Sequence, residues 1–172
     1  MAFKRVFVAM SGGVDSTGAA LLLLRQGYDV SGVTLRLRPD CPNGQGPETE
    51  IEAARTAAAA LGISHTVLDL RELFQTAVMD RFVSEYAQGR TPNPCLDCNR
   101  AIKFGAMLDW ALEQGADALA TGHYANVSFD SASGRWRLLR GRDRRKDQSY
   151  FLYQLTQHQL AHLMLPVGQY EK

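Results

Sequence analysis

Apolar positions along the chain alternate between short runs of strand length and longer stretches with helical spacing. The short runs are rich in β-branched residues and are bounded by glycine, proline or polar residues, which is typical of strands buried in a parallel sheet. The pattern predicts four strands, at Arg5–Ala9, Asp29–Leu37, Ser64–Leu70 and Ala118–Thr121. It predicts four helices between these strands, at Asp15–Gln26, Glu48–Leu61, Leu73–Ala87 and Ile102–Glu113. This alternation indicates an α/β fold, an open parallel sheet with helices on both faces.

The C-terminal third of the chain has a different pattern. Two short runs, Tyr124–Phe129 and Arg135–Arg140, flank the polar segment 130–134 and predict a small β-hairpin. Ser149–Leu163 has helical spacing and is expected to be a helix. Pro166–Lys172 is expected to be a tail.

Composition and charge are those of a globular protein. Apolar residues make up 45% and charged residues 22% of the 172 positions, so we expect a single domain spanning residues 1–172. No apolar run has the length of a membrane span or a signal-peptide core, and we therefore expect a cytoplasmic protein with no membrane partner. Net charge is only +1, but basic residues gather in one segment, at Arg135, Arg137, Arg140, Arg142, Arg144, Arg145 and Lys146. Such a stripe suits an RNA backbone, and equally a solvated hairpin.

A glycine-rich segment, Ser11-Gly12-Gly13-Val14-Asp15-Ser16, lies between the first expected strand and the first expected helix. Its glycines let backbone amides approach a ligand closely, and the helix N-terminus behind them favours a phosphate group. The segment has neither the Gly-Lys-Ser/Thr of a Walker loop nor the G-x-G-x-x-G of a dinucleotide site. A carboxylate at Asp15 would repel phosphates unless a Mg²⁺ ion lay between them. The alternative is a plain turn in which Asp15 or Ser16 caps the helix.

The order Ser-Gly-Gly-Val-Asp-Ser after a strand resembles the PP-loop of the ATP pyrophosphatases, which have an adenine nucleotide alpha-hydrolase-like fold. Six further motifs narrow the resemblance: Gly89-Arg90-Thr91-Pro92-Asn93-Pro94, Cys98-Asn99, Ile102-Lys103-Phe104, Ala120-Thr121-Gly122-His123-Tyr124, Leu138-Leu139-Arg140-Gly141 and Lys146-Asp147-Gln148-Ser149-Tyr150-Phe151-Leu152. In this order they are similar to the N-terminal catalytic domain of the bacterial tRNA-specific 2-thiouridylases, over nearly the whole chain.

The resemblance implies an ATP- and Mg²⁺-dependent tRNA-uridine 2-sulfurtransferase. Such enzymes adenylate the C2 oxygen of the wobble uridine, release pyrophosphate and replace the oxygen with sulfur, so tRNA and a sulfur donor (a persulfide carrier or sulfide) are the implied partners. The implied ATP-site residues are Ala9, Met10, Ser11, Gly12, Gly13, Val14, Asp15, Ser16, Leu35 and Gly122, with Asp15 also catalytic. The implied tRNA-contacting residues are Asn93, Pro94, Cys95, Lys146, Asp147 and Gln148.

Cys98 matches the first catalytic cysteine of this family. The Pro-containing segment Gly89–Cys98 is expected to be a loop, which would place Cys98 just before a helix whose N-terminus favours its thiolate. Cys95 stands where well-known members have an acidic residue. The second catalytic cysteine and the central and C-terminal domains of the family have no counterpart in these 172 residues. We therefore expect either a fragment or a short homologue, with a separate protein or chain segment supplying the missing parts.

The Cys95-x-x-Cys98 pair leaves three roles open. Cys95 could supply or resolve a persulfide on Cys98 by thiol–disulfide exchange, in place of the missing second cysteine. Cys41, Cys95 and Cys98 could instead hold three irons of a [4Fe–4S] cluster, which is the hypothesis that we favour. Zinc is the third option, with His158 and His162 spaced four residues apart, although the long sequence separation fits no compact zinc motif.

Two other functions remain compatible with the sequence. One is an ATP pyrophosphatase that adenylates a small carboxylate or carbonyl compound. The other is a non-catalytic or partner-dependent module that binds ATP, holds an iron–sulfur cluster or handles sulfur.

Overall fold

A five-stranded parallel sheet forms the centre of the computed structural model, which describes residues 4–39 and 46–172. Its strands are β1 (Arg5–Ala9), β2 (Asp29–Arg36), β3 (His65–Asp69), β4 (Ala118–Thr121) and β7 (Leu163–Met164). They lie in the order β3-β2-β1-β4-β7, and every neighbouring pair is parallel. The four strands predicted from the pattern are confirmed, whereas β7 was not predicted.

Helices cover both faces of this sheet, as predicted. Alternate residues of β1 point to opposite faces, so Val6 and Val8 pack in one apolar cluster while Phe7 belongs to the other. The first cluster includes apolar residues of α1 (Val14–Arg25) and α2 (Pro47–Leu61). The second includes residues of α6 (Met107–Glu113). Each fully buried aliphatic or aromatic side chain contributes about 1.5–3 kcal/mol, so both faces are stabilised chiefly by burial.

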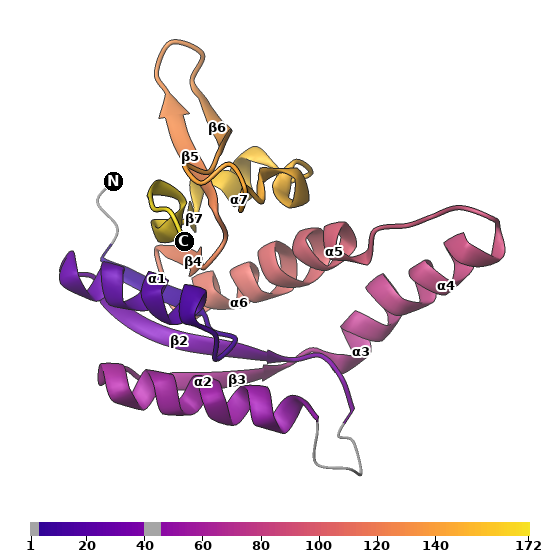
Figure 1. The fold of residues 1–172 in the computed structure, drawn as a ribbon, viewed down its shortest axis with the longest axis horizontal. Helices are drawn as coiled ribbons and strands as arrows, with labels where there is room; N and C mark the ends of the chain where they lie inside the picture. The colour runs from indigo at the N-terminus through magenta and orange to yellow at the C-terminus, as the bar shows by residue number, and fades with distance from the viewer. Residues whose placement is uncertain (1–3, 40–45) are drawn as a thin grey trace.

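Two helical stretches extend between β3 and β4. The first is made of α3 (Arg71–Phe74), η1 (Gln75–Met79) and α4 (Asp80–Ala87), and α4 lies at the end of the molecule away from the hairpin (Figure 1). The second is made of α5 (Pro94–Asp97), the π-helical segment η2 (Cys98–Ala106) and α6.

The expectation of a loop over Gly89–Cys98 is wrong for its second half. The helical stretch begins at Pro94, because the Asn93 side chain accepts a hydrogen bond from the Cys95 amide (3.1 Å) and proline suits the first helical position. Cys98 therefore lies one turn inside the helical stretch rather than just before it.

The C-terminal third forms a hairpin and a set of short elements. The predicted hairpin is confirmed as β5 (Ala125–Asp130) and β6 (Arg135–Arg140), which stand away from the main sheet (Figure 1). The single helix predicted over Ser149–Leu163 is wrong, because that range holds η3 (Ser149–Leu152), then α7 (Gln157–Ala161), and then the start of β7.

The segment expected to be a tail is packed against the hairpin. It contains η4 (Pro166–Gln169), with Val167 buried. The Gly168 carbonyl accepts hydrogen bonds from the Arg142 amide (2.9 Å) and from the Asn126 side chain (3.2 Å). Within residues 4–39 and 46–172, no helix combines the length and apolar character that crossing a bilayer requires.

Candidate functional site

The glycine-rich loop joins β1 to α1 and is closed by hydrogen bonds of its own. The Ser11 amide donates to Ser16 Oγ (3.2 Å), and the Ser16 hydroxyl donates to the Gly13 carbonyl (3.1 Å), as does Thr17 Oγ1 (3.0 Å). The hydroxyl proton of Ser16, one of the residues implied at the ATP site, is thus used within the loop. Gly13 is the N-cap of α1 and, in the part of the chain that the structure describes, no side chain caps this helix. The first amides of α1 therefore remain available to an anion, with the positive end of the helix dipole behind them.

Two close backbone approaches fix the position of this loop. A methyl group at Gly122, just after β4, would lie 2.7 Å from both the Asp15 carbonyl carbon and the Ser16 amide nitrogen. On the other side, Gly12 has a φ of +75°, and a methyl group there would lie 2.6 Å from the Cβ of Ala53 in α2. The loop is therefore held between the end of β4 and helix α2, at positions that only glycine fits.

A cavity of about 390 Å³ opens beside the loop at the carboxyl ends of the strands. Seven of the ten residues expected at the ATP site line it, namely Ala9, Met10, Ser11, Asp15, Ser16, Leu35 and Gly122. Gly12, Gly13 and Val14 are not part of the lining. Val33, Leu37 and Met107 supply apolar surface, and Glu50, Lys103, Thr121, His123 and Gln148 supply polar groups. A volume in the range of small-molecule sites, an apolar wall and a cradle of amides fit a nucleotide with its base and phosphates.

Asp15 is paired with a cation and a hydroxyl in this structure. Its Oδ2 accepts a hydrogen bond from Lys172 Nζ (2.7 Å), and its Oδ1 accepts one from Tyr124 Oη (3.1 Å). The Asp15 carboxylate raises the pKa of Lys172, and burial together with the Asp15 contact raises the pKa of Tyr124. Mg²⁺ is commonly held by one or two carboxylates together with substrate phosphates. A carboxylate in the cavity wall is a suitable donor, so Asp15 fits this role if the ion takes the place of the Lys172 ammonium.

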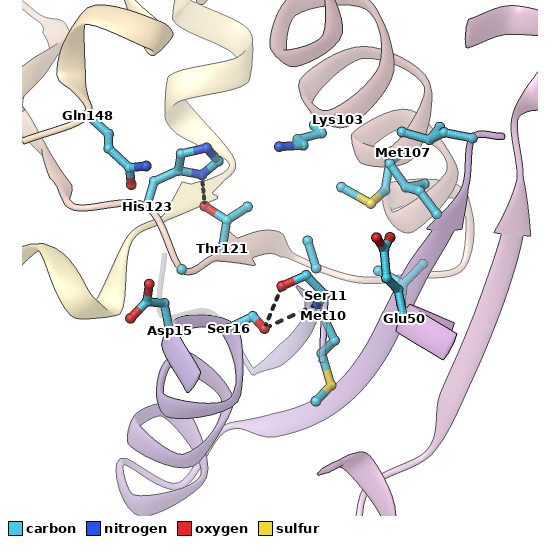
Figure 2. A pocket seen from close by; sticks show the side chains of 15 residues that line it. Met10, Ser11, Asp15, Ser16, Glu50, Lys103, Met107, Thr121, His123 and Gln148 are labelled. Atoms are coloured by element: carbon cyan, nitrogen blue, oxygen red, sulfur yellow. Dashed lines mark hydrogen bonds between the residues drawn. The ribbon is translucent and has the colours of Figure 1, made fainter. Parts of the chain in front are cut away.

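A second, smaller cavity of about 220 Å³ contains both described cysteines. Its lining consists of Cys95, Cys98, Asn99, Lys103, His123, Gln148 and Phe151. Three of these side chains, Lys103, His123 and Gln148, also line the larger cavity. Figure 2 shows these three across the cavity from Ser11, Asp15 and Ser16. The helical stretch formed by α5 and η2, called the cysteine helix below, and the glycine loop therefore meet at the same edge of the sheet.

The Cys98 thiol is in a different electrostatic environment from the one expected. Burial raises the pKa of Cys98, the nearby Lys103 ammonium lowers it, and Cys95 raises it again. The expected stabilisation of the thiolate by a helix N-terminus is not what the structure provides, because the helix begins at Pro94 and Cys98 lies in its second turn. Lys103 is the group that favours the thiolate here.

His123 is held as a neutral imidazole. Burial, with a smaller contribution from the Lys103 charge, lowers the pKa of His123 to about 3. Its Nδ1 lies 2.8 Å from the hydroxyl of the buried Thr121, which fixes the orientation of the ring. Near neutral pH this side chain can offer or accept a hydrogen bond but carries no charge in the wall between the cavities.

The residues expected to contact tRNA fall into distinct positions. Asn93 caps the cysteine helix and Pro94 is its first residue, while Cys95 is exposed beside the smaller cavity. Asp147 accepts hydrogen bonds from the Gly141 amide (2.8 Å) and the Ser149 hydroxyl (2.9 Å), so it holds its own loop together. Gln148 lines both cavities, whereas Lys146 and the six arginines of the basic segment are exposed on or after β6.

The proposed cluster ligands are only partly described. Cys95 is exposed and Cys98 is half-buried, and both are free thiols, but Cys41 lies outside the described residues. Over 4–39 and 46–172, no group of three or more His, Cys, Asp or Glu side chains is arranged to hold a metal ion. His158 of α7 contacts His162, the C-cap residue of that helix, with ring centroids 4.7 Å apart, and the pair lines neither cavity. The three-cysteine cluster and the zinc site therefore stay predictions.

Several residues of the site were not assigned a role from the sequence. Lys103 and His123 lie within motifs that the resemblance rested on, so the motif itself was the available signal. Tyr124 and Lys172 contact Asp15 across more than 100 residues of sequence, and no local pattern reveals such contacts.

The parallel sheet, the glycine loop after its central strand and the cavity at the strand ends define a nucleotide-binding domain of the HUP class, with a PP-loop. The chain belongs to the tRNA methyl transferase HUP domain family, whose model matches residues 4–172. A PP-loop in such a domain implies ATP as the nucleotide.

Curated relatives carry the same domain in a longer chain. The chain is 53% identical over 172 residues to the tRNA-specific 2-thiouridylase MnmA of Moorella thermoacetica, covering 96% of this chain and 48% of that protein. It is 49% identical over 175 residues to the protein of the same name from Pelotomaculum thermopropionicum, covering 98% and 48% respectively. The chain thus spans about half the length of these relatives.

Among solved structures, the predicted subunit of tRNA methyltransferase from Methanocaldococcus jannaschii has a similar fold. The TM-score is 0.58 at 20% sequence identity, and the match covers 98% of this chain and 70% of that one. This similarity supports the fold alone.

Proposed function

We propose that this chain is the ATP-using domain of a tRNA 2-thiouridylase, in which the wobble uridine is adenylated and then thiolated. The observation that carries the proposal is the shared wall of the two cavities, in which Lys103, His123 and Gln148 face both. A nucleotide in the larger cavity and a base in the smaller one would then lie in contact. The identity to the 2-thiouridylases supports the same reaction.

In the first step, the C2 oxygen of the uridine attacks the α-phosphorus of ATP. The bond from that phosphorus to the oxygen bridging to the β-phosphate breaks, and pyrophosphate leaves with the electron pair. The amides of the Ser11–Ser16 loop would hold the leaving diphosphate, and Asp15 would hold the Mg²⁺ ion. When bound, Mg²⁺ neutralises phosphate charge. The step converts a poor leaving group, a ring carbonyl oxygen, into AMP.

The target uridine must leave its base stack to enter the smaller cavity. Unstacking costs least in a single-stranded loop such as an anticodon. We propose that Asn93, Pro94 and Cys95 border the base, that Gln148 meets it at the shared wall, and that Lys146 and the basic segment contact phosphates. Asp147 would act indirectly, by holding the loop that carries Gln148.

In the second step, a sulfur nucleophile attacks C2 and AMP leaves with the original oxygen. With sulfide as donor, this displacement gives 2-thiouridine directly. With a persulfide on Cys98, the terminal sulfur attacks and a C2–S–S–Cys98 linkage forms. The Cys95 thiolate then attacks Cys98 Sγ, the electron pair goes to the sulfur on C2, and a Cys95–Cys98 disulfide forms. A thiol reductant must reduce this disulfide before the next turnover.

The cluster hypothesis for Cys41, Cys95 and Cys98 is a separate proposal for the same thiols, and such a cluster would present a free iron to sulfide. Anaerobic reconstitution followed by iron and sulfide analysis tests it. A cluster that persists in Cys41→Ser, or iron well below stoichiometric, rejects a three-cysteine site.

The decisive experiment separates adenylation from sulfur transfer. We expect pyrophosphate release from ATP to depend on tRNA and to be lost in Asp15→Ala, because that variant lacks the carboxylate beside the phosphates. Cys98→Ser should still release pyrophosphate with tRNA but form no 2-thiouridine when the donor is a persulfide, whereas sulfide, which attacks C2 directly, should still give product. Cys95→Ser is the matched variant, and it should lose product only when the donor is a persulfide.

The same assay separates the alternatives. Pyrophosphate release driven by a small carboxylate without RNA indicates another ATP pyrophosphatase. Nucleotide binding without turnover on tRNA indicates a binding module that depends on partner segments, such as those of the longer relatives.

A further inference from the structure

Two exposed tyrosine side chains contact each other next to Phe151, which lines the smaller cavity, called the cysteine cavity below. Tyr150 and Tyr153 are 63% and 58% exposed, and their ring centroids lie 5.8 Å apart with planes inclined by 33°. Large aromatic rings are normally buried, and an exposed cluster of them marks a binding surface more often than a single exposed apolar residue does. We call this pair the tyrosine platform.

The platform is attached rigidly to the rim of the cysteine cavity. Tyr150 adjoins Phe151, which lines that cavity, and the two rings contact edge to face with centroids 5.7 Å apart; Tyr153 contacts Tyr150. The Phe151 carbonyl accepts a hydrogen bond from the side chain of the buried Asn99 (3.0 Å), the residue after Cys98. Leu152 is fully buried and anchors the same turn to the core. The turn that carries the two rings is therefore anchored beside the residue that follows Cys98.

The volume of the cysteine cavity indicates which part of an RNA would lie over the tyrosine platform. Sites for drug-sized molecules measure roughly 300–1,000 Å³, whereas this cavity measures about 220 Å³. It suits one unstacked base and leaves the neighbouring nucleotides outside at the rim. A base that has lost its neighbour from the stack exposes one aromatic face to water. Arg100 and Lys146 have cationic side chains that suit the adjoining phosphates. They lie within two residues of Asn99 and Gln148, which line the cavity.

We propose that the tyrosine platform stacks the nucleobase adjacent in RNA to the base that enters the cysteine cavity. The inference rests on the proposed function, because it takes the occupant of that cavity to be an RNA base. Stacking on aromatic side chains tolerates any base, since every base has a π-face. The platform therefore replaces the lost stacking partner without reading sequence, and it lowers the cost of unstacking the target.

Binding of an anticodon stem-loop RNA to this chain tests the proposal. The RNA carries 2-aminopurine next to the target uridine, so that stacking on an aromatic ring quenches its fluorescence. We expect quenching with the unaltered chain, and a loss of affinity of about 5- to 100-fold with quenching abolished in Tyr150→Ala and Tyr153→Ala. Tyr150→Phe and Tyr153→Phe should stay within about twofold of the unaltered chain, because the ring and not the hydroxyl carries the interaction.

The matched control is Tyr86→Ala on α4, which truncates another exposed tyrosine, 55% exposed and in contact with Phe82. It should leave both affinity and quenching unchanged. Unfolding curves that coincide with that of the unaltered chain show that the platform variants fold. No quenching in the unaltered chain, no RNA binding, or equal losses in the control and platform variants would overturn the proposal.

Pyrophosphate release measured on the same samples separates this proposal from the proposed function. Full RNA-dependent release in the alanine variants with no change in quenching rejects the platform alone. Quenching that depends on the tyrosines, together with no RNA-dependent release in any variant, rejects the proposed reaction and keeps the RNA-binding surface.

Discussion

Replacing Gly122 by alanine tests whether the close approach of β4 to the glycine loop positions the nucleotide site. The added methyl group would lie 2.7 Å from the Asp15 carbonyl carbon and from the Ser16 amide nitrogen. Carbon atoms in contact prefer a separation of about 3.5–4.0 Å, so the start of α1 and the end of β4 must separate by close to 1 Å. Neither atom belongs to a flexible side chain. The N-terminus of the helix must therefore move as a whole.

Gly122→Ala should lower two quantities separately, the stability of the fold and the affinity for ATP. Overpacking of this kind destabilises the fold by about 1–3 kcal/mol, which denaturant unfolding followed by circular dichroism will measure. A displacement of about 1 Å in a positioned binding group can cost up to about 100-fold, so we expect ATP affinity measured by calorimetry to fall at least tenfold. Most of the lost affinity should come from the phosphates, and adenosine should bind almost as before.

The matched control lies in the same helix. An alanine at Gly18 of α1 meets no heavy atom within 4 Å. Gly18→Ala should stabilise the fold by about 0.5–1 kcal/mol, since glycine is less favourable than alanine inside a helix, and it should leave ATP affinity unchanged. If Gly122→Ala binds ATP and unfolds like the unaltered chain, the reasoning about this backbone contact is refuted.

Two further predictions concern the shared wall. Lys103→Met should raise the pKa of Cys98, because the Lys103 ammonium lowers that pKa. Alkylation of Cys98 by iodoacetamide at pH 8 should therefore slow by roughly two- to tenfold in Lys103→Met and stay near the unaltered rate in Lys103→Arg. Equal rates in all three proteins would contradict this. The folded-state pKa of His123, about 3, lies below its ordinary value of 6.5, so its contribution to stability is complete above pH 6.5 and is lost as pH falls toward 3. The unfolding free energy of the unaltered chain should therefore fall more steeply than that of His123→Gln, by about 1.4 kcal/mol per pH unit between roughly pH 6 and 4, and parallel curves would show that His123 is not held neutral.

The first two-thirds of the fold could be read from the sequence because its signals are local. Strands such as Arg5–Ala9 are buried on both faces and appear as continuous apolar runs, and helices such as α2 end at glycine. The start of the cysteine helix was also readable, because Asn93 followed by Pro94 is an N-cap followed by a first-turn proline. Reading the prolines only as loop signals misplaced Cys98 by one turn.

The C-terminal elements could not be read in the same way because distant contacts decide them. Leu163 and Met164 form a strand only through pairing with Leu119 and Ala120 of β4, and two residues carry no period. The short helix before them, α7, begins after Thr156. The Gln159 amide donates a hydrogen bond to the Thr156 side chain, and the Thr156 amide donates one to the Gln159 side chain. Apolar residues at helical spacing across 149–163 serve three different elements, so periodicity alone predicts one helix where the structure has none of that length.

The strand order explains why the nucleotide and thiol cavities adjoin. From β1 the chain moves outward through β2 and β3, then returns to place β4 on the opposite side of β1. The connection that follows β1 therefore leads to one side of the sheet and the connection that follows β4 leads to the other. Where two such connections diverge, they leave a crevice at the carboxyl ends of the strands. The glycine loop after β1 and the Gly122–His123 turn after β4 border that crevice. The cavity beside the glycine loop is therefore a consequence of topology, whereas the thiol and the ammonium group next to it come from the helical segment from Pro94 to Ala106, which supplies Cys98 and Lys103. A related domain could keep the crevice and change the groups beside it by changing that one segment.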